Sequence, residues 1–288
     1  MSSKERRQSS IPDSVENAVW LNPDDQSVYW SQNVLDFYYG GDSQFCYSTY
    51  MGQTPLDREW WGGVLGYCGD GYMQETHVRA WCNKLIQDRE TKYRRGTSSS
   101  NTFRWTILPP NFIDLLAEQD NDAYGYATGS VELYPPFWDV DTVYIPVSKE
   151  KEGWVILKID MHSLKITVYF TNKCDALNCG ERFCIHRRIH QILVEFESLF
   201  LWFLGRIQYW ENAGLSEADA LDYTGDVVWP TSEHRVGRNS GVILCMLLQN
   251  LVQNSVLPNW QERNMQDACM RYRRFMADQL YSARFIPH

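Results

Sequence analysis

The chain has 288 residues, of which 44% are hydrophobic and 14% aromatic, so it can bury a substantial core and is not a disordered protein. Its formal net charge of −9 argues against a general nucleic-acid binder, because the affinity of such proteins comes from neutralising phosphates. Nucleic acid is therefore not expected as a direct ligand.

The N-terminus is polar and carries a short basic run, Lys4-Glu5-Arg6-Arg7, without the apolar segment of a secretory signal. Residues 1–16 are expected to form a disordered tail, and residues 17–288 one globular domain. The most apolar run, residues 192–210, is interrupted by charged side chains, so no membrane span is expected. The eight cysteines follow no disulfide-scaffold spacing, which is typical of a reducing compartment. The expected location is the nucleus or the cytoplasm.

Two helices are predicted before residue 120. Apolar residues recur at helical spacing from Met73 to Ile86, and Thr76 is a candidate N-cap. Pro109-Pro110 precedes a shorter helix, because proline is tolerated in the first helical turn.

The middle of the chain is rich in β-branched and aromatic residues, which predicts strands. The three stretches are Val143–Val147, Trp154–Asp160 and Lys165–Phe170. The last two are separated by residues 161–164, a gap that fits a hairpin.

Three helices are expected after the strands, at about Ile185–Glu211, Ser240–Asn254 and Gln261–Ser282. The first is apolar around more than one face, which predicts a helix that is either deeply buried or partly an interface, with burial as the default. In the last, Arg271, Arg273 and Arg274 predict a small basic face that is solvated or paired. Strands grouped between helices indicate an α+β domain whose sheet is covered by helices.

Three separated stretches carry a resemblance to a known family: residues 71–81, the strands between residues 138 and 170, and Arg238–Cys245. In this order they resemble the opening-helix motif, the paired strands and the nucleophile segment of the ubiquitin-like-protein (SUMO)-specific cysteine proteases. The plant, often transposon-associated branch is the most similar. The resemblance covers about residues 60–285 and implies a papain-like or adenain-type α+β fold, with a central mixed sheet flanked by helices.

The resemblance also places the catalytic positions of the family on residues that differ from the family pattern. The histidine falls on Gly153, the acidic residue on Phe170, the oxyanion glutamine on His234 and the nucleophilic cysteine on Ser240. Thiol proteolysis needs a thiolate, a histidine base and an orienting group, and a serine hydroxyl depends on a base even more than a thiol does. The sequence therefore predicts a catalytically inactive pseudoprotease that acts as a protein-interaction or scaffold subunit.

Other readings of these positions stay open. Ser240 alone could be an inactivating change or a switch to serine chemistry, with His234 as a replacement base, or it could simply cap its helix. The alternative function is an active cysteine-type deSUMOylating or ubiquitin-like peptidase, in which Cys245 or another cysteine lies near His162 or His234.

Two aromatic residues are candidates for substrate binding. Trp154 and Tyr72 match the family tryptophans that cover a narrow tunnel for a diglycine tail, although large rings are common in cores and ordinary core packing is the favoured interpretation of both. Glu75 stands where the family has aspartate. The expected partner is a protein, either a ubiquitin-like modifier or a multisubunit complex.

One cluster has the character of a metal site, and it contains Cys174, Cys179, Cys184, His186 and His190. Zinc binds thiolates and imidazoles, and the two histidines would share one helical face. The spacing matches no common zinc finger, so the other interpretation is a loop with buried cysteines before a helix. No metal or other cofactor is expected.

Overall fold

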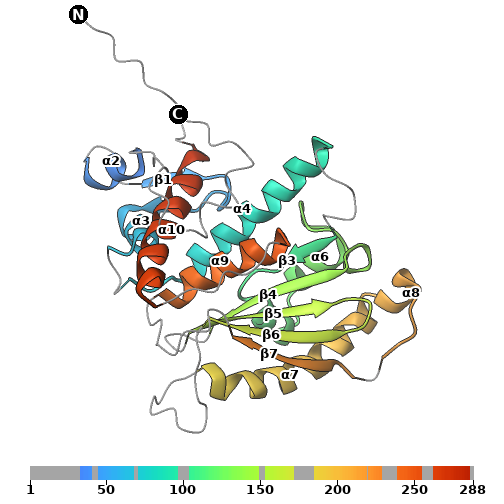
Figure 1. The fold of residues 1–288 in the computed structure, drawn as a ribbon. Coiled ribbons are helices and arrows are strands. Elements are labelled where there is room, and N and C mark those ends of the chain that lie inside the picture. Colours follow the sequence, from blue (N-terminus) through green and yellow to red (C-terminus); the bar gives the residue numbers. More distant parts are fainter. Residues whose placement is uncertain are drawn as a thin grey trace, which may run out of the picture.

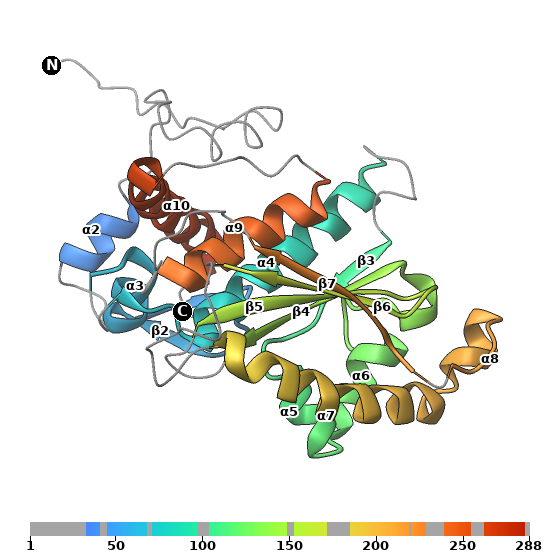
Figure 2. The same cartoon turned by 60° about the horizontal axis from the view of Figure 1, so that its bottom comes forward.

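A five-stranded mixed sheet lies at the centre of the chain, with helices on both faces (Figures 1 and 2). The computed structural model describes residues 33–40, 45–67, 71–96, 104–148, 153–171, 185–218, 220–228, 239–254 and 262–285. The predicted N-terminal tail lies outside the described residues.

The strand order in this sheet is β3-β4-β5-β6-β7. The strands are β3 (Trp105–Ile107), β4 (Thr142–Ser148), β5 (Trp154–Asp160), β6 (Lys165–Phe170) and β7 (Asp222–Val228). The three central strands are antiparallel to one another, while β3 and β7 run parallel to their neighbours at the two edges.

The sequence predicts the three central strands, and the structure confirms them, with β4 one residue longer at each end. The two edge strands were not predicted. β3 has three residues, which is too few to reveal the alternation of apolar and polar residues that marks a strand. β7 contains Asp222, Gly225 and Asp226, which are residue types depleted in strands, so its pairing with β6 depends on tertiary contacts.

One face of the sheet is covered by α4 (Glu75–Arg94) and α9 (Ser240–Val252), which Figure 2 shows above the strands, and α10 (Glu262–Ser282) packs against both helices. The helix α9 is apolar on all sides, and nearly all of its residues are buried. A helix of this kind is stable only inside a core, and α9 packs against β5 of the sheet and against the helices α4 and α10.

The other face is covered by α5 (Phe112–Ala117), α6 (Asn121–Thr128) and α7 (Ile185–Arg206). The helix predicted to extend to Glu211 ends at Arg206, because Gln208 adopts a left-handed backbone with φ of 55°, and a short helix α8 (Tyr209–Ala213) follows. The prediction of burial on several faces is wrong for α7. Phe196, Phe200 and Phe203 enter the core, whereas Trp202 is 42% exposed.

A second, smaller sheet joins the two ends of the described chain. It has the antiparallel order β2-β1-β8 and contains β1 (Phe45–Ser48), β2 (Pro55–Asp57) and β8 (Arg284–Phe285). The helices α2 (Asn33–Tyr39) and α3 (Arg58–Leu65) pack beside it against α10. No helix within the described residues has both the length and the apolarity needed to cross a membrane.

Candidate functional site

The three stretches that carry the family resemblance meet at the first turn of α9. A Cβ atom placed on Gly241 would lie 2.4 Å from Cβ of Met73 and 3.1 Å from Nε1 of Trp154. No side chain fits in that space, so glycine allows the segment before α4 and the start of β5 to close on α9. The three stretches are therefore neighbours in the folded chain.

Ser240 is the first residue of α9 and is buried. The N-cap is Asn239, so the prediction that Ser240 caps the helix is wrong by one residue. The backbone of Asn239 is already close to helical, with φ of −90° and ψ of −1°, and its side chain makes no capping hydrogen bond. Within the described residues, no imidazole or carboxylate forms a hydrogen bond with the Ser240 hydroxyl.

Gly153, at the family's histidine position, lies directly before β5 and has a φ of 118°. This left-handed backbone is one that residues with a side chain rarely adopt. A histidine at this position would be strained unless the backbone changed. The difference from the family pattern is therefore built into the local backbone as well as into the side chain.

Phe170, at the family's acidic position, ends β6 opposite Val155 of β5. Its ring is buried in the apolar core on the α7 side of the sheet. The next residue, Thr171, donates a hydrogen bond of 3.0 Å from Oγ1 to the carbonyl oxygen of Trp154, which joins the two strand ends. The position that the resemblance assigns to the orienting acidic residue is thus part of the hydrophobic core.

The two histidines considered as replacement bases are not brought to this site in the described chain. His234 lies outside the described residues. His162 lies in the turn after β5, where its Nε2 is 2.8 Å from Oδ1 of Asp141. The strand β5 separates that turn from Gly153 by roughly 20 Å, given about 3.3 Å per residue. His162 is therefore too far from the start of α9 to act as its base.

Cys245, the cysteine considered as a displaced nucleophile, lies in the second turn of α9 and is fully buried. Burial raises the pKa of its thiol well above the ordinary value, and the neighbouring Cys82 raises it further. The thiolate is the nucleophilic form, so this environment disfavours the reactive species.

Arg273 of α10 forms hydrogen bonds with α3, with the segment before α4 and with the start of α9. The sequence did not predict this role. The basic face on which it was predicted to lie was expected to be solvated or paired, and solvation is wrong for Arg273, because its side chain is 1% exposed. Pairing is confirmed at Arg274, whose Nε lies 3.8 Å from Oδ1 of Asp278. Nη1 of Arg273 donates to the carbonyl oxygens of Gly63 and Val64 at 3.0 and 3.2 Å, and its Nη2 donates to the carbonyl oxygen of Gly71. Nη2 also lies 3.4 Å from Oδ1 of Asn239, the N-cap of α9.

The sequence did contain a signal for this burial. Arg273 lies four residues after Cys269 and four before Ala277, and both of these are buried. Residues four apart share a helix face, so the arginine lies on the apolar stripe of α10. An arginine on such a stripe needs acceptors, and the backbone carbonyls of α3 and of the α3–α4 connection supply them.

The start of α4 depends on a second buried ionisable group, His77. The predicted N-cap was Thr76, but the N-cap is Gln74, whose backbone N–H donates to Nδ1 of His77 at 3.0 Å. Thr76 instead accepts a hydrogen bond from Nε1 of Trp60. Burial lowers the pKa of His77 to about 4, so the ring is neutral at pH 7.

The two candidate substrate aromatics differ in their surroundings. Trp154 is 4% exposed and lies against the first turn of α9, whereas Tyr72 is 37% exposed. Of the two, Tyr72 is the side chain that a partner can contact without rearrangement of the core.

The candidate zinc ligands lie mostly beyond the described part of the chain. Cys174, Cys179 and Cys184 are outside it, and the side chain of His186 is not described. His190 is exposed on α7, with its ring centroid 6.1 Å from that of Tyr223. The described residues contain no group of three side chains that could hold a metal ion. Zinc binding was the alternative to the expectation of no metal, and elemental analysis of the purified protein would check it.

No protein-family model matches this chain, and no curated protein sequence matches it. Solved structures do match. The C-terminal Ulp1 protease domain of yeast, in complex with Smt3, the yeast ortholog of SUMO, has a TM-score of 0.56 at 13% identity, covering 88% of this chain and 93% of that chain. The Ulp1-like SUMO protease catalytic domain of Chaetomium thermophilum has a TM-score of 0.53 at 15% identity, covering 88% of each chain.

Identities this low show the fold and leave the activity open. The order of strands and helices described above, with a mixed five-stranded sheet between two helical layers, confirms the predicted α+β fold class. The chain has the fold of the Ulp1-type SUMO protease catalytic domain.

Proposed function

We propose that this chain is a catalytically silent protein with the SUMO protease fold, and that it acts as a protein-interaction or scaffold subunit. The observation that carries the proposal is the backbone of Gly153, whose φ of 118° disfavours a histidine where the fold's proteases would hold their base. Without an imidazole at that place, the buried Ser240 hydroxyl has no base supplied by β5.

Two further observations support the loss of catalysis. Phe170 is part of the apolar core, so an acidic side chain there would be buried without a partner. Arg273 and Met73 also contact each other and the start of α9, Arg273 at Asn239 and Met73 at Gly241. The scaffold is thus retained by packing that does not depend on the catalytic groups.

The alternative is an active cysteine-type peptidase with displaced catalytic residues. The cysteines within the described residues, Cys46, Cys82, Cys245 and Cys269, are all buried. Burial raises the pKa of each of their thiols, which argues against a reactive thiolate among them.

A cleavage assay tests the proposal directly. The full chain is incubated with a SUMO precursor and with a SUMO–protein conjugate, beside the Ser240→Ala variant and an active SUMO protease as positive control. We expect no cleavage above the buffer rate by either form of the chain. Cleavage that Ser240→Ala abolishes would overturn the proposal. Cleavage that survives Ser240→Ala but is stopped by a thiol-alkylating reagent would establish the alternative.

The partner is a separate question, and a ubiquitin-like modifier is our first candidate because of the fold. Calorimetric titration of SUMO and of ubiquitin into the wild-type chain and into Tyr72→Ala tests it. Tyr72 is suited to this because its truncation leaves the core intact, whereas Trp154→Ala would disturb the packing of α9. We expect binding that Tyr72→Ala weakens. If neither modifier binds, the expected partner is instead a subunit of a multisubunit complex. Affinity purification from the source cells would identify it. The plant origin and the nuclear or cytoplasmic location stay predictions from the sequence.

A further inference from the structure

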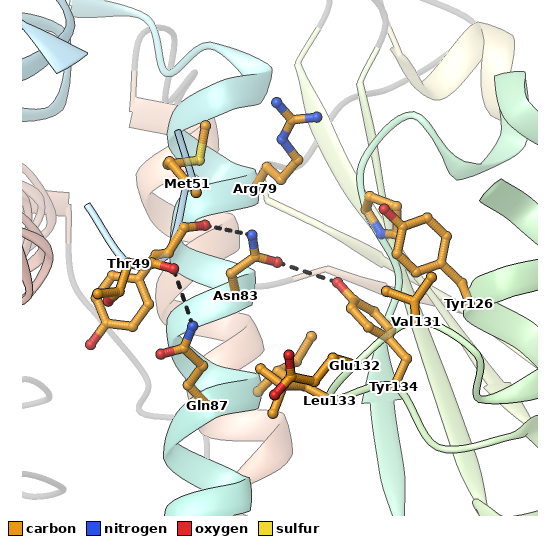
Figure 3. A pocket seen from close by; sticks show the side chains of 14 residues that line it. Thr49, Met51, Arg79, Asn83, Gln87, Tyr126, Val131, Glu132, Leu133 and Tyr134 are labelled. Atoms are coloured by element: carbon orange, nitrogen blue, oxygen red, sulfur yellow. Dashed lines mark hydrogen bonds between the residues drawn. The ribbon is translucent and has the colours of Figure 1, made fainter. Parts of the chain in front are cut away.

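A cavity of about 330 Å³ lies beside the helix α4, away from the catalytic positions (Figure 3). Its walls come from α4, from the turn between β1 and β2, and from the loop at residues 131–134. We call it the Arg79 cavity, after the arginine that α4 contributes to it. Thr49, Gly52 and Glu132 on its lining are exposed, so the cavity is open to solvent.

The walls of the Arg79 cavity are fixed by hydrogen bonds that cross between elements distant in sequence. Asn83 donates from Nδ2 to the carbonyl oxygen of Tyr50 at 2.7 Å, and its Oδ1 accepts from the Tyr134 hydroxyl at 3.3 Å. Gln87 of the same helix donates to the carbonyl oxygen of Thr49 at 3.4 Å. Figure 3 shows these three bonds tying both loops to one face of α4. The cavity is therefore formed before any ligand binds.

A buried arginine holds the second loop in place. Arg89 of α4 donates from Nη2 to the carbonyl oxygen of Leu133 at 2.6 Å and from Nη1 to the carbonyl oxygen of Trp105. The rings of Tyr126 and Tyr134 pack edge to face with centroids 4.6 Å apart. Because preorganised walls lower the entropy lost on binding, such a site suits a ligand of defined shape.

The cation at the end of this cavity has no partner among the described residues. Arg79 is half-buried and forms no hydrogen bond or ion pair within the part of the chain that the structure describes. Burial raises the pKa of Tyr126 and of Tyr134, so both hydroxyls on the lining of the cavity are neutral at pH 7. The hydroxyl of Tyr134 already donates to Asn83, so the guanidinium of Arg79 and the hydroxyl of Tyr126 are the groups that can donate to a ligand.

The charge of the cavity favours a ligand group with a single negative charge. Figure 3 shows Glu132 at the end of the cavity opposite Arg79, so a dianionic phosphate would meet one cation and one anion. A carboxylate needs one guanidinium, which it can accept in a two-pronged pair. The volume of about 330 Å³ is at the lower limit for small-molecule sites and suits one or two side chains.

We propose that the Arg79 cavity binds an extended segment of a protein partner through one aspartate or glutamate side chain, which pairs with Arg79, and one apolar neighbour, which packs on Met51 and Leu133. The claim that the ligand is a protein rests on the interaction role proposed above. The cavity itself contains none of the catalytic positions, so its failure as a binding site leaves the cleavage assay unaffected.

A peptide selection tests this proposal. The full chain is immobilised and exposed to a random heptapeptide display library, in parallel with Arg79→Gln and with the control Arg95→Gln, which removes an exposed arginine at the end of the same helix. We expect peptides with aspartate or glutamate beside an apolar residue from the wild type and from Arg95→Gln, and their loss with Arg79→Gln. Peptides without an enriched acidic residue, or the same enrichment with Arg79→Gln, would overturn the proposal.

Titration of one selected peptide gives the size of the effect. Exchange of its acidic residue for the amide, and the Arg79→Gln exchange in the chain, are each expected to weaken binding about tenfold or more, as for a desolvated charge pair. Arg95→Gln should change the affinity less than about twofold. Acetate and glutarate serve as probes for a small-molecule acid. If either binds to the wild type as tightly as the peptide does, the ligand is not a protein segment and the proposal fails. If the Arg79→Gln variant unfolds at the same temperature as the wild type, its fold is intact.

Discussion

Arg273 on α10 donates a hydrogen bond of 3.0 Å from Nη1 to the carbonyl oxygen of Gly63, near the end of α3. The two residues are separated by most of the chain, and the same guanidinium also reaches Gly71 and Asn239. One buried side chain therefore connects α3, the segment before α4 and the start of α9. The segment before α4 and the start of α9 are also two of the three segments that meet at Gly241.

Arg273→Met should destabilise the protein strongly. The exchange leaves several buried carbonyl oxygens without donors, and each such group costs about 1–3 kcal/mol, so we expect a loss of at least about 3 kcal/mol in the free energy of unfolding. Urea denaturation measures it. The control Arg94→Met removes an exposed arginine paired with Glu90 and should cost less than about 0.5 kcal/mol. Similar losses for both variants would contradict the role of Arg273.

Gly241→Ala should destabilise the protein although it replaces glycine within a helix. Alanine is ordinarily favoured over glycine there by about 1 kcal/mol. At this position its Cβ would meet Met73 at 2.4 Å, so we expect a net loss of about 1–3 kcal/mol. Gly205→Ala in α7 is the matched control, because a Cβ there meets nothing within 4 Å, and it should stabilise the protein. Thermal unfolding of the two variants should show shifts of opposite sign.

Gly153→His should not restore a catalytic base. The φ of 118° at this residue is rarely adopted by residues with a side chain, and the strain should cost about 1–3 kcal/mol of stability. The double variant Gly153→His, Ser240→Cys is expected to leave a SUMO precursor uncleaved, while a thermal transition confirms that it is folded. Measurable cleavage by this variant would mean that the backbone at residue 153 adapts easily to histidine. It would also mean that few substitutions separate the chain from proteolytic activity.

The stability of the protein should fall as the pH decreases from about 6.5 to about 4, in part because of His77. Burial lowers the pKa of His77 to about 4 in the folded state, whereas the unfolded value is about 6.5. The unfolded chain therefore binds the proton first, and stability that is complete above pH 6.5 is lost on acidification. The difference between these two pKa values corresponds to about 3 kcal/mol of unfolding free energy, at 1.36 kcal/mol for each pH unit.

Urea denaturation at a series of pH values checks this prediction. His77→Gln should reduce the slope between pH 6.5 and 4, whereas the control His190→Gln removes an exposed histidine and should leave the slope unchanged. An unchanged slope in His77→Gln would show that the ring is protonated in the folded protein or that the fold opens around it.

Cys46, Cys82, Cys245 and Cys269 should resist thiol reagents in the folded protein. All four are buried, and burial raises the pKa of Cys269 to about 12. Alkylation under native conditions followed by peptide mass spectrometry should show labelling of these residues only after unfolding. Rapid labelling of Cys245 alone would instead support the displaced-nucleophile alternative.

The sequence predicted the parts of the fold that depend on local patterns. The strands β5 and β6 and the hairpin between them follow from dense β-branched and aromatic residues around a short gap. The helix α9 follows from its apolar composition. The edge strand β7 could not be predicted, because Asp222, Gly225 and Asp226 have little strand preference and the strand forms by pairing with β6.

The sequence by itself determined which residue types occupy the positions that the family resemblance assigns to catalysis: Gly153, Phe170, His234 and Ser240. Tertiary structure decided what the described positions became. The left-handed backbone at Gly153, the burial of Phe170 and the contact of Gly241 with Met73 and Trp154 arise between segments far apart in the chain. The same is true of Arg273, whose acceptors are carbonyl oxygens that every residue carries. Because every residue carries a backbone carbonyl, the sequence does not show which carbonyls accept hydrogen bonds from a buried side chain. Only the folded structure shows this pairing.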